Sequence, residues 1–215
     1  MNSLNNTVVA DDSKVAVTPG NYVRAETDMH IKRMYGRRGL GKLGHRRTLS
    51  PPGVNDILHR NRDTLYSGAI CDLDNPAIAT LPETNGRYQS LHVISQDHYS
   101  FVVSKPGRYE LTKEKVGTRY AFLIFRTFVN AVDPKDIEQA HVLQDRIKVE
   151  GGASGPLEIP NWNTDQLRQA RDALNRLATL GTDLAGAFGT KQETDPVSHF
   201  IKILGLETTF ALRRG

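Results

Sequence analysis

The densest group of chemically active side chains is the run Asn-Arg-Asp-Thr, which leads directly into Leu-Tyr-Ser. Successive side chains of an extended segment alternate between its two faces, so Arg62, Thr64 and Tyr66 share one face. Asn61 and Asp63 lie on the opposite face, and Asp63 cannot pair with Arg62. Because burying an unpaired charge costs several kcal/mol, we expect Arg62 and Asp63 to be shielded from water and held by a surrounding hydrogen-bond network.

This run has two interpretations. As a structural feature, the network pins the first strand to the segment before it. As a functional site, Arg62 contacts an anion while Asp63 or Tyr66 transfers a proton in a ligand pocket. Both interpretations stay open, because hydrogen-bond networks of either kind perturb titratable groups.

A second group combines His92 with the run Gln96-Asp97-His98-Tyr99, whose spacing fits a hairpin that turns near Asp97 and His98. Two imidazoles and one carboxylate are able to bind a metal ion, but they are equally typical of a turn beside an exposed histidine. The sequence lacks a His-Glu-x-x-His motif and paired cysteines. We therefore expect no metal site and no cofactor.

Together these groups predict a binding or structural module for a small polar or saccharide-like ligand. The expected ligand-binding residues are Asn61, Arg62, Asp63, Thr64, Tyr66, His92 and Tyr99. The first alternative is a hydrolase or lyase, since histidine and carboxylate side chains suit proton transfer. Its candidate catalytic residues are Asp63, Tyr66, Asp97 and His98.

A basic stretch precedes both groups. No acidic residue interrupts its positive side chains, which are Lys32, Arg33, Arg37, Arg38, Lys42, His45, Arg46 and Arg47. Such a stretch attracts phosphates, so nucleic-acid binding through Lys32–Arg47 is the second alternative. Only Tyr35 is available there for base stacking, so a solvated loop explains the stretch better than a nucleic-acid site does.

The composition is that of a folded globular protein. The 215 residues include 38% hydrophobic and 24% charged side chains, with a net charge of +4. No apolar run approaches the roughly 18 residues that a membrane-spanning helix needs, so we expect no membrane partner. The first twenty residues lack the apolar segment of a secretory signal, which predicts a cytoplasmic protein. The lone Cys71 excludes a disulfide framework within one chain and is interpreted as a buried thiol.

β-Branched and aromatic residues follow strand patterns through the middle of the chain. These patterns predict strands over residues 65–73, 77–81, 87–95, 99–104, 108–112 and 119–129. The last of these segments is nearly continuously apolar, which indicates a central strand. Because the strands are short and leave no room for helical crossovers between them, the fold class is mainly β, an antiparallel sandwich with helical additions.

Helical signals flank the strands. Asn21 begins one helix and Asp133-Pro134 opens another, while residues 164–180 and 196–204 carry apolar side chains at helical spacing. Trp162 is expected to anchor the segment before residue 164. The chain divides accordingly into a flexible leader (1–20), a β-sandwich domain with its helices (21–150), a linker (151–163), a helical segment (164–205) and an unstructured tail (206–215).

Several separate motifs, in order along the chain, resemble the bacterial family catalogued as domain of unknown function 1254 (DUF1254). The resemblance extends from about residue 21 to residue 199. It rests on residues 21–28, 61–67, 97–99, 117–120 and 143–145. It implies an immunoglobulin-like β-sandwich followed by a small helical segment, and it implies no established reaction.

The end of the chain departs from that resemblance. In similar proteins the counterpart of residues 195–199 leads into a second, jelly-roll domain (DUF1214), but residues 203–215 show no such continuation. The departure implies a truncated family member whose tail is unrelated sequence. We expect the apolar helix face at residues 167–180 to lack part of its usual cover, which favours self-association.

Overall fold

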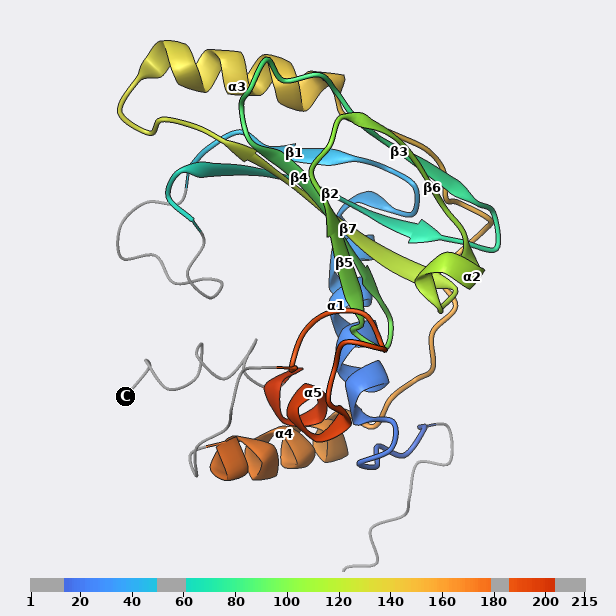
Figure 1. Cartoon of the computed structure of the whole chain (residues 1–215). Coiled ribbons are helices and arrows are strands. Elements are labelled where there is room, and N and C mark those ends of the chain that lie inside the picture. The colour runs from blue at the N-terminus through green and yellow to red at the C-terminus, as the bar shows by residue number, and fades with distance from the viewer. Residues whose placement is uncertain (1–13, 50–60, 179–185, 204–215) are drawn as a thin grey trace, which may run out of the picture.

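Figure 1 shows the computed structural model of the chain, which describes residues 14–49, 61–178 and 186–203. Within these ranges two antiparallel sheets are surrounded by helices, so the fold is mainly β with helical additions, as predicted. In the same ranges no helix is long and apolar enough to cross a membrane. The predicted tail and the first thirteen residues of the predicted leader lie outside the described residues.

The larger sheet has five antiparallel strands in the order β1-β2-β7-β4-β5. Their bounds are Gly44–Arg46 (β1), Thr64–Asp72 (β2), Tyr120–Phe128 (β7), Gln89–Ser95 (β4) and Ser100–Val103 (β5). β7 lies at the centre, as its apolar run predicted, because a central strand pairs on both edges and is largely buried. The predicted hairpin is also confirmed, since β4 pairs with β5 around a turn at residues 96–99.

The smaller sheet places one strand between two others. These are β3 (Ala77–Leu81) at the centre, with β6 (Gly107–Leu111) and β8 (Lys148–Gly151) beside it. Leu81 and Leu111 from this sheet share one apolar core with Leu91, Leu123 and Phe125 from the larger sheet. The side of the larger sheet that faces this core is its inner face, and the opposite side is its outer face.

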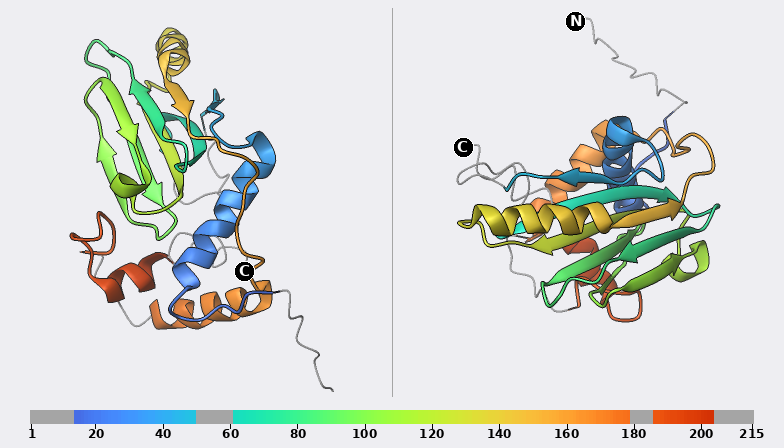
Figure 2. Two further views of the ribbon diagram at one scale, coloured as in Figure 1. Left: turned by 90° about the vertical axis from the view of Figure 1, so that its right-hand side faces the viewer. Right: turned by 90° about the horizontal axis from the view of Figure 1, so that it is seen from above.

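The helices pack around the sheets (Figures 1 and 2). Their bounds are Tyr22–Arg38 (α1), Lys113–Val116 (α2), Pro134–Arg146 (α3), Thr164–Ala178 (α4) and Pro196–Ile203 (α5). α1 covers part of the outer face, where Ile31 packs in one cluster with Ile70 and Tyr120. α3 packs at the end of the sheet where β2 begins, and α4 and α5 lie at the opposite end.

The predicted helix starts are confirmed by their capping contacts. Asp133 accepts a hydrogen bond from the α3 backbone, Asn163 from the α4 backbone and Asp195 from the α5 backbone. α1 also begins directly after Asn21, but the Asn21 side chain bonds to the backbone of the preceding turn instead of the helix. A short polar residue therefore marks each start, even where the cap bond is absent.

Three short elements were missed by the sequence patterns. β1, α2 and β8 contain three or four residues each, and their sequences are Gly-His-Arg, Lys-Glu-Lys-Val and Lys-Val-Glu-Gly. None of them is long enough to show a period, so no local signal distinguishes them from loops. Backbone pairing also reaches into the predicted leader, where Val15 forms a bridge with Trp162.

Candidate ligand site

The polar run before β2 is exposed, and the prediction that Arg62 and Asp63 are shielded from water is wrong. Asn61, Arg62 and Asp63 lie in a turn that ends where β2 begins at Thr64. The alternation of an extended strand does not apply in a turn, and water solvates both charges without help from a buried network. Within the described residues, the Asp63 carboxylate accepts one local hydrogen bond, from the Thr64 hydroxyl at 3.0 Å.

The four residues of the proton-transfer hypothesis divide between two ends of the sheet. Tyr66 pairs with Arg126 near the start of β2, whereas Asp97 and His98 follow Ser95 at the far end of β4. Ser95 pairs with Ala121, so five residues of β7, or roughly 17 Å at about 3.4 Å per residue, separate the two levels. Asp63 and Tyr66 therefore do not meet Asp97 and His98 in one pocket.

The hairpin residues are engaged in contacts with α1. The Arg24 guanidinium donates to the Asp97 carboxylate at 2.6 Å. His98 has a positive φ of 64°, and its Nδ1 lies 3.3 Å from the Thr27 hydroxyl oxygen. That hydroxyl donates its own proton to the Val23 carbonyl, so it must accept from His98, which fixes the imidazole proton on Nδ1. Burial first, and then neighbouring histidines, lower the pKa of His98 to about 3, so it is neutral near pH 7.

Tyr99 packs against the C-terminal helix instead of facing an open site. Its ring stacks on the His199 imidazole with 4.4 Å between centroids and 6° between planes. The two ring nitrogens of His199 each lie 3.0 Å from a backbone carbonyl, at Ala187 and at Asp97. These contacts dock α5 onto the hairpin, which gives Tyr99 a structural role.

A buried carboxylate joins α1 to the hairpin and to the segment before α4. Asp28 is fully buried and accepts hydrogen bonds from Gln96 Nε2 at 2.7 Å and from Trp162 Nε1 at 2.9 Å. Burial raises the pKa of Asp28 despite these donors. Trp162 therefore anchors its segment, as predicted, and the motif residues Asp28, Gln96 and Tyr99 hold the parts of the fold together.

A second buried carboxylate lies at the same end of the larger sheet, where β2 ends and β7 begins. Asp72 accepts hydrogen bonds from Arg119 at 2.8 Å and from the Ser154 hydroxyl at 2.5 Å. Burial raises the pKa of Asp72, but these donors outweigh it and hold the pKa below its ordinary value. The neighbouring Cys71 is buried, and burial raises the pKa of its thiol to about 12, as expected for a structural cysteine and not a nucleophile. No group of three potential metal ligands occurs among the described residues.

The basic stretch spans two elements of secondary structure. Part of it belongs to the end of α1, and another part forms β1 and the residues after it. Arg47 donates to the His141 carbonyl at 2.9 Å and pairs with Asp145, so it joins this stretch to α3. The Arg38 guanidinium packs directly over Gly44, where an added Cβ would lie 2.2 Å from its Cζ. Arg38 and Arg47 of the basic stretch therefore contact other parts of the fold.

A different set of polar side chains meets on the outer face of the larger sheet. Arg126 of β7 lies directly opposite Tyr66 of β2 on one side and opposite Ser90 of β4 on the other. His92 lies two residues beyond Ser90 and therefore on the same face. Directly opposed side chains in an antiparallel pair have Cβ atoms about 5 Å apart. We call Tyr66, Ser90, His92 and Arg126 the outer-face site.

Two groups in the outer-face site have unused hydrogen-bonding capacity. Ser90 is 1% exposed, and its hydroxyl has no hydrogen-bond partner among the described residues. Arg126 is half-buried, and its guanidinium has no hydrogen bond or ion pair anywhere in the described part of the chain. Buried polar groups are normally satisfied, so two unsatisfied neighbours are unusual and favour a missing partner.

The imidazole of the site is neutral. His92 is half-buried and its Nδ1 is buried without a partner among the described residues. Burial, and then the charge of Arg126, lower the pKa of His92 to about 4. Near pH 7 the site therefore presents one guanidinium, one neutral imidazole and the hydroxyls of Ser90 and Tyr66.

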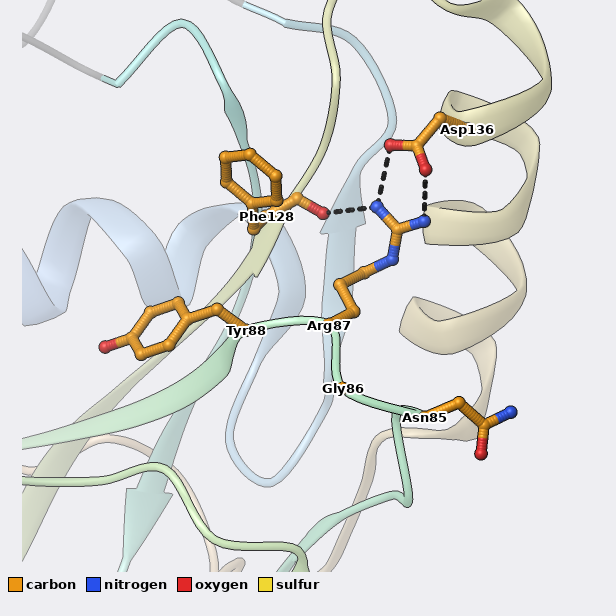
Figure 3. Close-up of a pocket in the computed structure, with 6 residues that line it drawn as sticks. All are labelled: Asn85, Gly86, Arg87, Tyr88, Phe128 and Asp136. Atoms are coloured by element: carbon orange, nitrogen blue, oxygen red, sulfur yellow. Dashed lines mark hydrogen bonds and ion pairs between the residues drawn. The ribbon is translucent and has the colours of Figure 1, made fainter.

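Two exposed aromatic rings border the outer-face site. The Phe128 backbone N–H donates to the Tyr88 carbonyl at 3.0 Å, which extends the β7–β4 ladder by one pair and sets Tyr88 opposite Phe128. Both rings are exposed, at 58% for Tyr88 and 43% for Phe128. Figure 3 shows both rings pointing to one side of the backbone, away from the Arg87–Asp136 ion pair. These six residues, Asn85, Gly86, Arg87, Tyr88, Phe128 and Asp136, line a shallow surface pocket.

The sequence interpretation found only half of the outer-face site. It named Tyr66 and His92 but missed Ser90 and Arg126. The available signal was Arg126, the one charged residue within the nearly continuous apolar run of residues 120–129. The partner of that arginine depends on strand register, which sequence patterns alone do not provide.

Comparison with known protein families shows to which family this chain belongs. The chain is a two-sheet, mainly β protein with a polar site on one sheet face, and no curated protein matches its sequence. The model of the family described as "Protein of unknown function (DUF1254)" matches residues 40–151, and the chain belongs to this family. The matched residues include all strands of the larger sheet and therefore the whole outer-face site.

A solved structure shares the fold. The VPA0106 protein from Vibrio parahaemolyticus superimposes with a TM-score of 0.61 at 16% sequence identity. The match covers 92% of this chain and 66% of that chain, so this chain spans less than two thirds of its length. The similarity supports the arrangement of strands and helices and carries no information on activity.

Proposed function

We propose that this protein is a binding module for a small polar ligand and that the outer-face site holds that ligand. One observation carries the proposal. The Ser90 hydroxyl is buried without a partner directly opposite Arg126, whose guanidinium is also unpaired within the described residues. Leaving a buried polar group unsatisfied costs about 1–3 kcal/mol, and a bound acceptor atom removes that cost.

The donors of the site project from neighbouring strands of one sheet face. Tyr66 accepts a hydrogen bond from the Asn61 backbone at 3.3 Å, so its own hydroxyl proton is available for a ligand. Ser90 and Arg126 supply further donors on the adjacent strands. All of these side chains project from one sheet, and the backbone ladder fixes their strands in register.

The hydrolase or lyase alternative receives no comparable support. Its residues lie at two separate levels of the sheet, and Asp97 and His98 already contact Arg24 and Thr27. A proton-transfer mechanism needs its acid and base within hydrogen-bond reach of one substrate. Binding through the outer-face site is therefore the better explanation of the geometry.

A thermal-shift screen tests the proposal. The wild-type protein is heated with organic anions, sugars and small amides, because a ligand that binds only the folded form raises the melting temperature. The Arg126→Gln variant is expected to lose the response. The control is Arg108→Gln, since Arg108 lies on β6 of the other sheet in an exposed pair with Glu150. A response that survives Arg126→Gln, or no response to any probe, contradicts the proposal.

The family resemblance adds three expectations to this proposal, which concern the type of β-sandwich, a second domain in longer relatives, and self-association. We infer an immunoglobulin-like sandwich, supported by two antiparallel sheets that share one core. We also infer that longer relatives continue into a DUF1214 domain, an inference supported by the third of the VPA0106 chain that lies outside the match. Self-association is a further possibility to test, because Leu177 on α4 remains 45% exposed.

A further inference from the structure

We propose that the outer-face site binds a monocarboxylate that carries a flat ring, with the carboxylate on Arg126 and Ser90 and the ring on Tyr88 and Phe128. This inference rests on the proposed binding function and adds the chemical class of the ligand. It uses the charge of the site, the geometry of its donors and the position of the two exposed rings.

The charge of the site matches a single negative charge. Arg126 is the one permanently charged side chain among Tyr66, Ser90, His92 and Arg126, and no carboxylate pairs with it in the described part of the chain. The nearest further cation in register is Arg46, opposite Tyr66 on β1, and its Nε already donates to the Thr48 carbonyl. A phosphate dianion would therefore bring more charge than the unpaired guanidinium neutralises.

The donor geometry favours a carboxylate over a neutral polar group. A guanidinium presents two parallel N–H groups that match the two oxygens of a carboxylate. The Ser90 hydroxyl, directly opposite on β4, adds a third donor to the same acceptor group. An ionised carboxylate only accepts hydrogen bonds, so it satisfies every donor and brings none that competes with them.

The rings border the site on its open side. Phe128 lies two residues from Arg126 on the same face of β7, which is about 7 Å along the strand. Tyr88 lies directly opposite Phe128 through the extended ladder. A ring joined to the carboxylate directly or through one carbon spans this distance, and stacking on exposed aromatic rings removes apolar surface from water. A carboxylate without a ring leaves both aromatic side chains uncovered.

Isothermal titration calorimetry with three probes separates these contributions. Benzoate carries both features, acetate carries only the carboxylate, and benzamide carries the ring with a neutral polar group. We expect benzoate to bind at least tenfold more tightly than acetate and benzamide. Arg126→Gln is expected to abolish benzoate binding, and Phe128→Ala to weaken it about tenfold while leaving acetate binding unchanged. Val132→Ala, at an 89% exposed apolar position outside the site, is the control and is expected to bind benzoate as the wild type does.

The outcomes distinguish the ligand class from the binding function. Equal affinity for acetate and benzoate overturns the role of the rings. Tighter binding of benzamide, a sugar or inorganic phosphate, lost in Arg126→Gln, overturns the carboxylate class but leaves the binding function in place. If no probe binds wild-type protein that circular dichroism shows to be folded, both the class and the proposed function are overturned.

Discussion

Ser90 lies directly opposite Arg126 across the β4–β7 ladder, and neither side chain has a hydrogen-bond partner among the described residues. The two buried carboxylates described above differ from this pair, since Asp28 and Asp72 each receive at least two side-chain hydrogen bonds. Within the described residues, Ser90 and Arg126 receive no such hydrogen bonds on the outer face of the larger sheet. Ser90 and Arg126 differ from other unsatisfied groups, such as the Ser95 hydroxyl, in that they lie opposite each other on one sheet face.

Replacing Ser90 by alanine should weaken ligand binding without destabilising the fold. Removing an unsatisfied buried hydroxyl removes its desolvation cost, so the free energy of unfolding should stay equal or rise by up to about 1 kcal/mol. Urea denaturation measures that free energy, and calorimetry should show at least tenfold weaker benzoate binding.

Ser95→Ala is the matched control, because the Ser95 hydroxyl is also buried without a partner in the described part of the chain but lies on the inner face of β4. It should leave benzoate binding unchanged. A loss of more than 1 kcal/mol in Ser90→Ala would show that the hydroxyl has an internal partner and would remove the main support for the site.

Acid should destabilise the protein through its buried histidines. The folded-state pKa values of His98 and His92, about 3 and about 4, lie below the ordinary value of 6.5. The unfolded chain therefore binds protons first, and stability that is complete above pH 6.5 falls as the pH drops toward 4. Each histidine removes up to about 1.4 kcal/mol per pH unit in that window, and urea denaturation at several pH values measures the slope.

His98→Asn identifies the larger contributor. Asparagine tolerates the positive φ at this position, and its amide can donate to Thr27 as the Nδ1–H does. The variant should match the wild-type stability near pH 8 within about 1 kcal/mol and lose less stability on acidification. An unchanged pH slope would mean that His98 is not the neutral buried group described above.

Much of the fold follows from local sequence, whereas the site does not. β2, β3, β4 and β7 were predicted within two residues, because each is long enough to show alternation or an apolar run. Arg62 and Asp63 looked like site residues because the strand pattern was extended back by two positions into the turn. The informative residues, Ser90 and Arg126, are ordinary within their own strands and become a pair only through tertiary register.

Asp28→Asn should destabilise the fold although it removes a charge. Both Asp28 oxygens accept, one from Gln96 and one from Trp162. An asparagine amide nitrogen donates, so one of these contacts would place two donors together, at a cost of about 1–3 kcal/mol. Because burial raises the pKa of Asp28, the folded state binds a proton more readily than the unfolded chain, so the wild type gains stability as the pH falls through that raised pKa and the variant does not. Equal stability of variant and wild type at pH 7 would show that the Trp162 contact contributes little.

The segment after β8 depends on a close approach at Gly152. Gly152 is buried with a φ of +67°, and an added Cβ would lie 2.8 Å from the Cys71 sulfur and 3.0 Å from the Ala77 Cβ. Its carbonyl accepts a hydrogen bond from the Asp72 backbone at 2.9 Å, so the backbone cannot retreat without breaking that contact. Gly152→Ala should therefore lower the free energy of unfolding by about 2–4 kcal/mol, from left-handed backbone strain and overpacking together.

Gly155→Ala isolates the packing contribution to that loss. Gly155 also has a positive φ, of +138°, but an added Cβ would meet nothing within 4 Å. Its substitution should cost only the backbone part, about 1–3 kcal/mol in urea denaturation. If both variants lose the same stability, the contact of Gly152 with Cys71 and Ala77 is not what holds this segment against the sandwich.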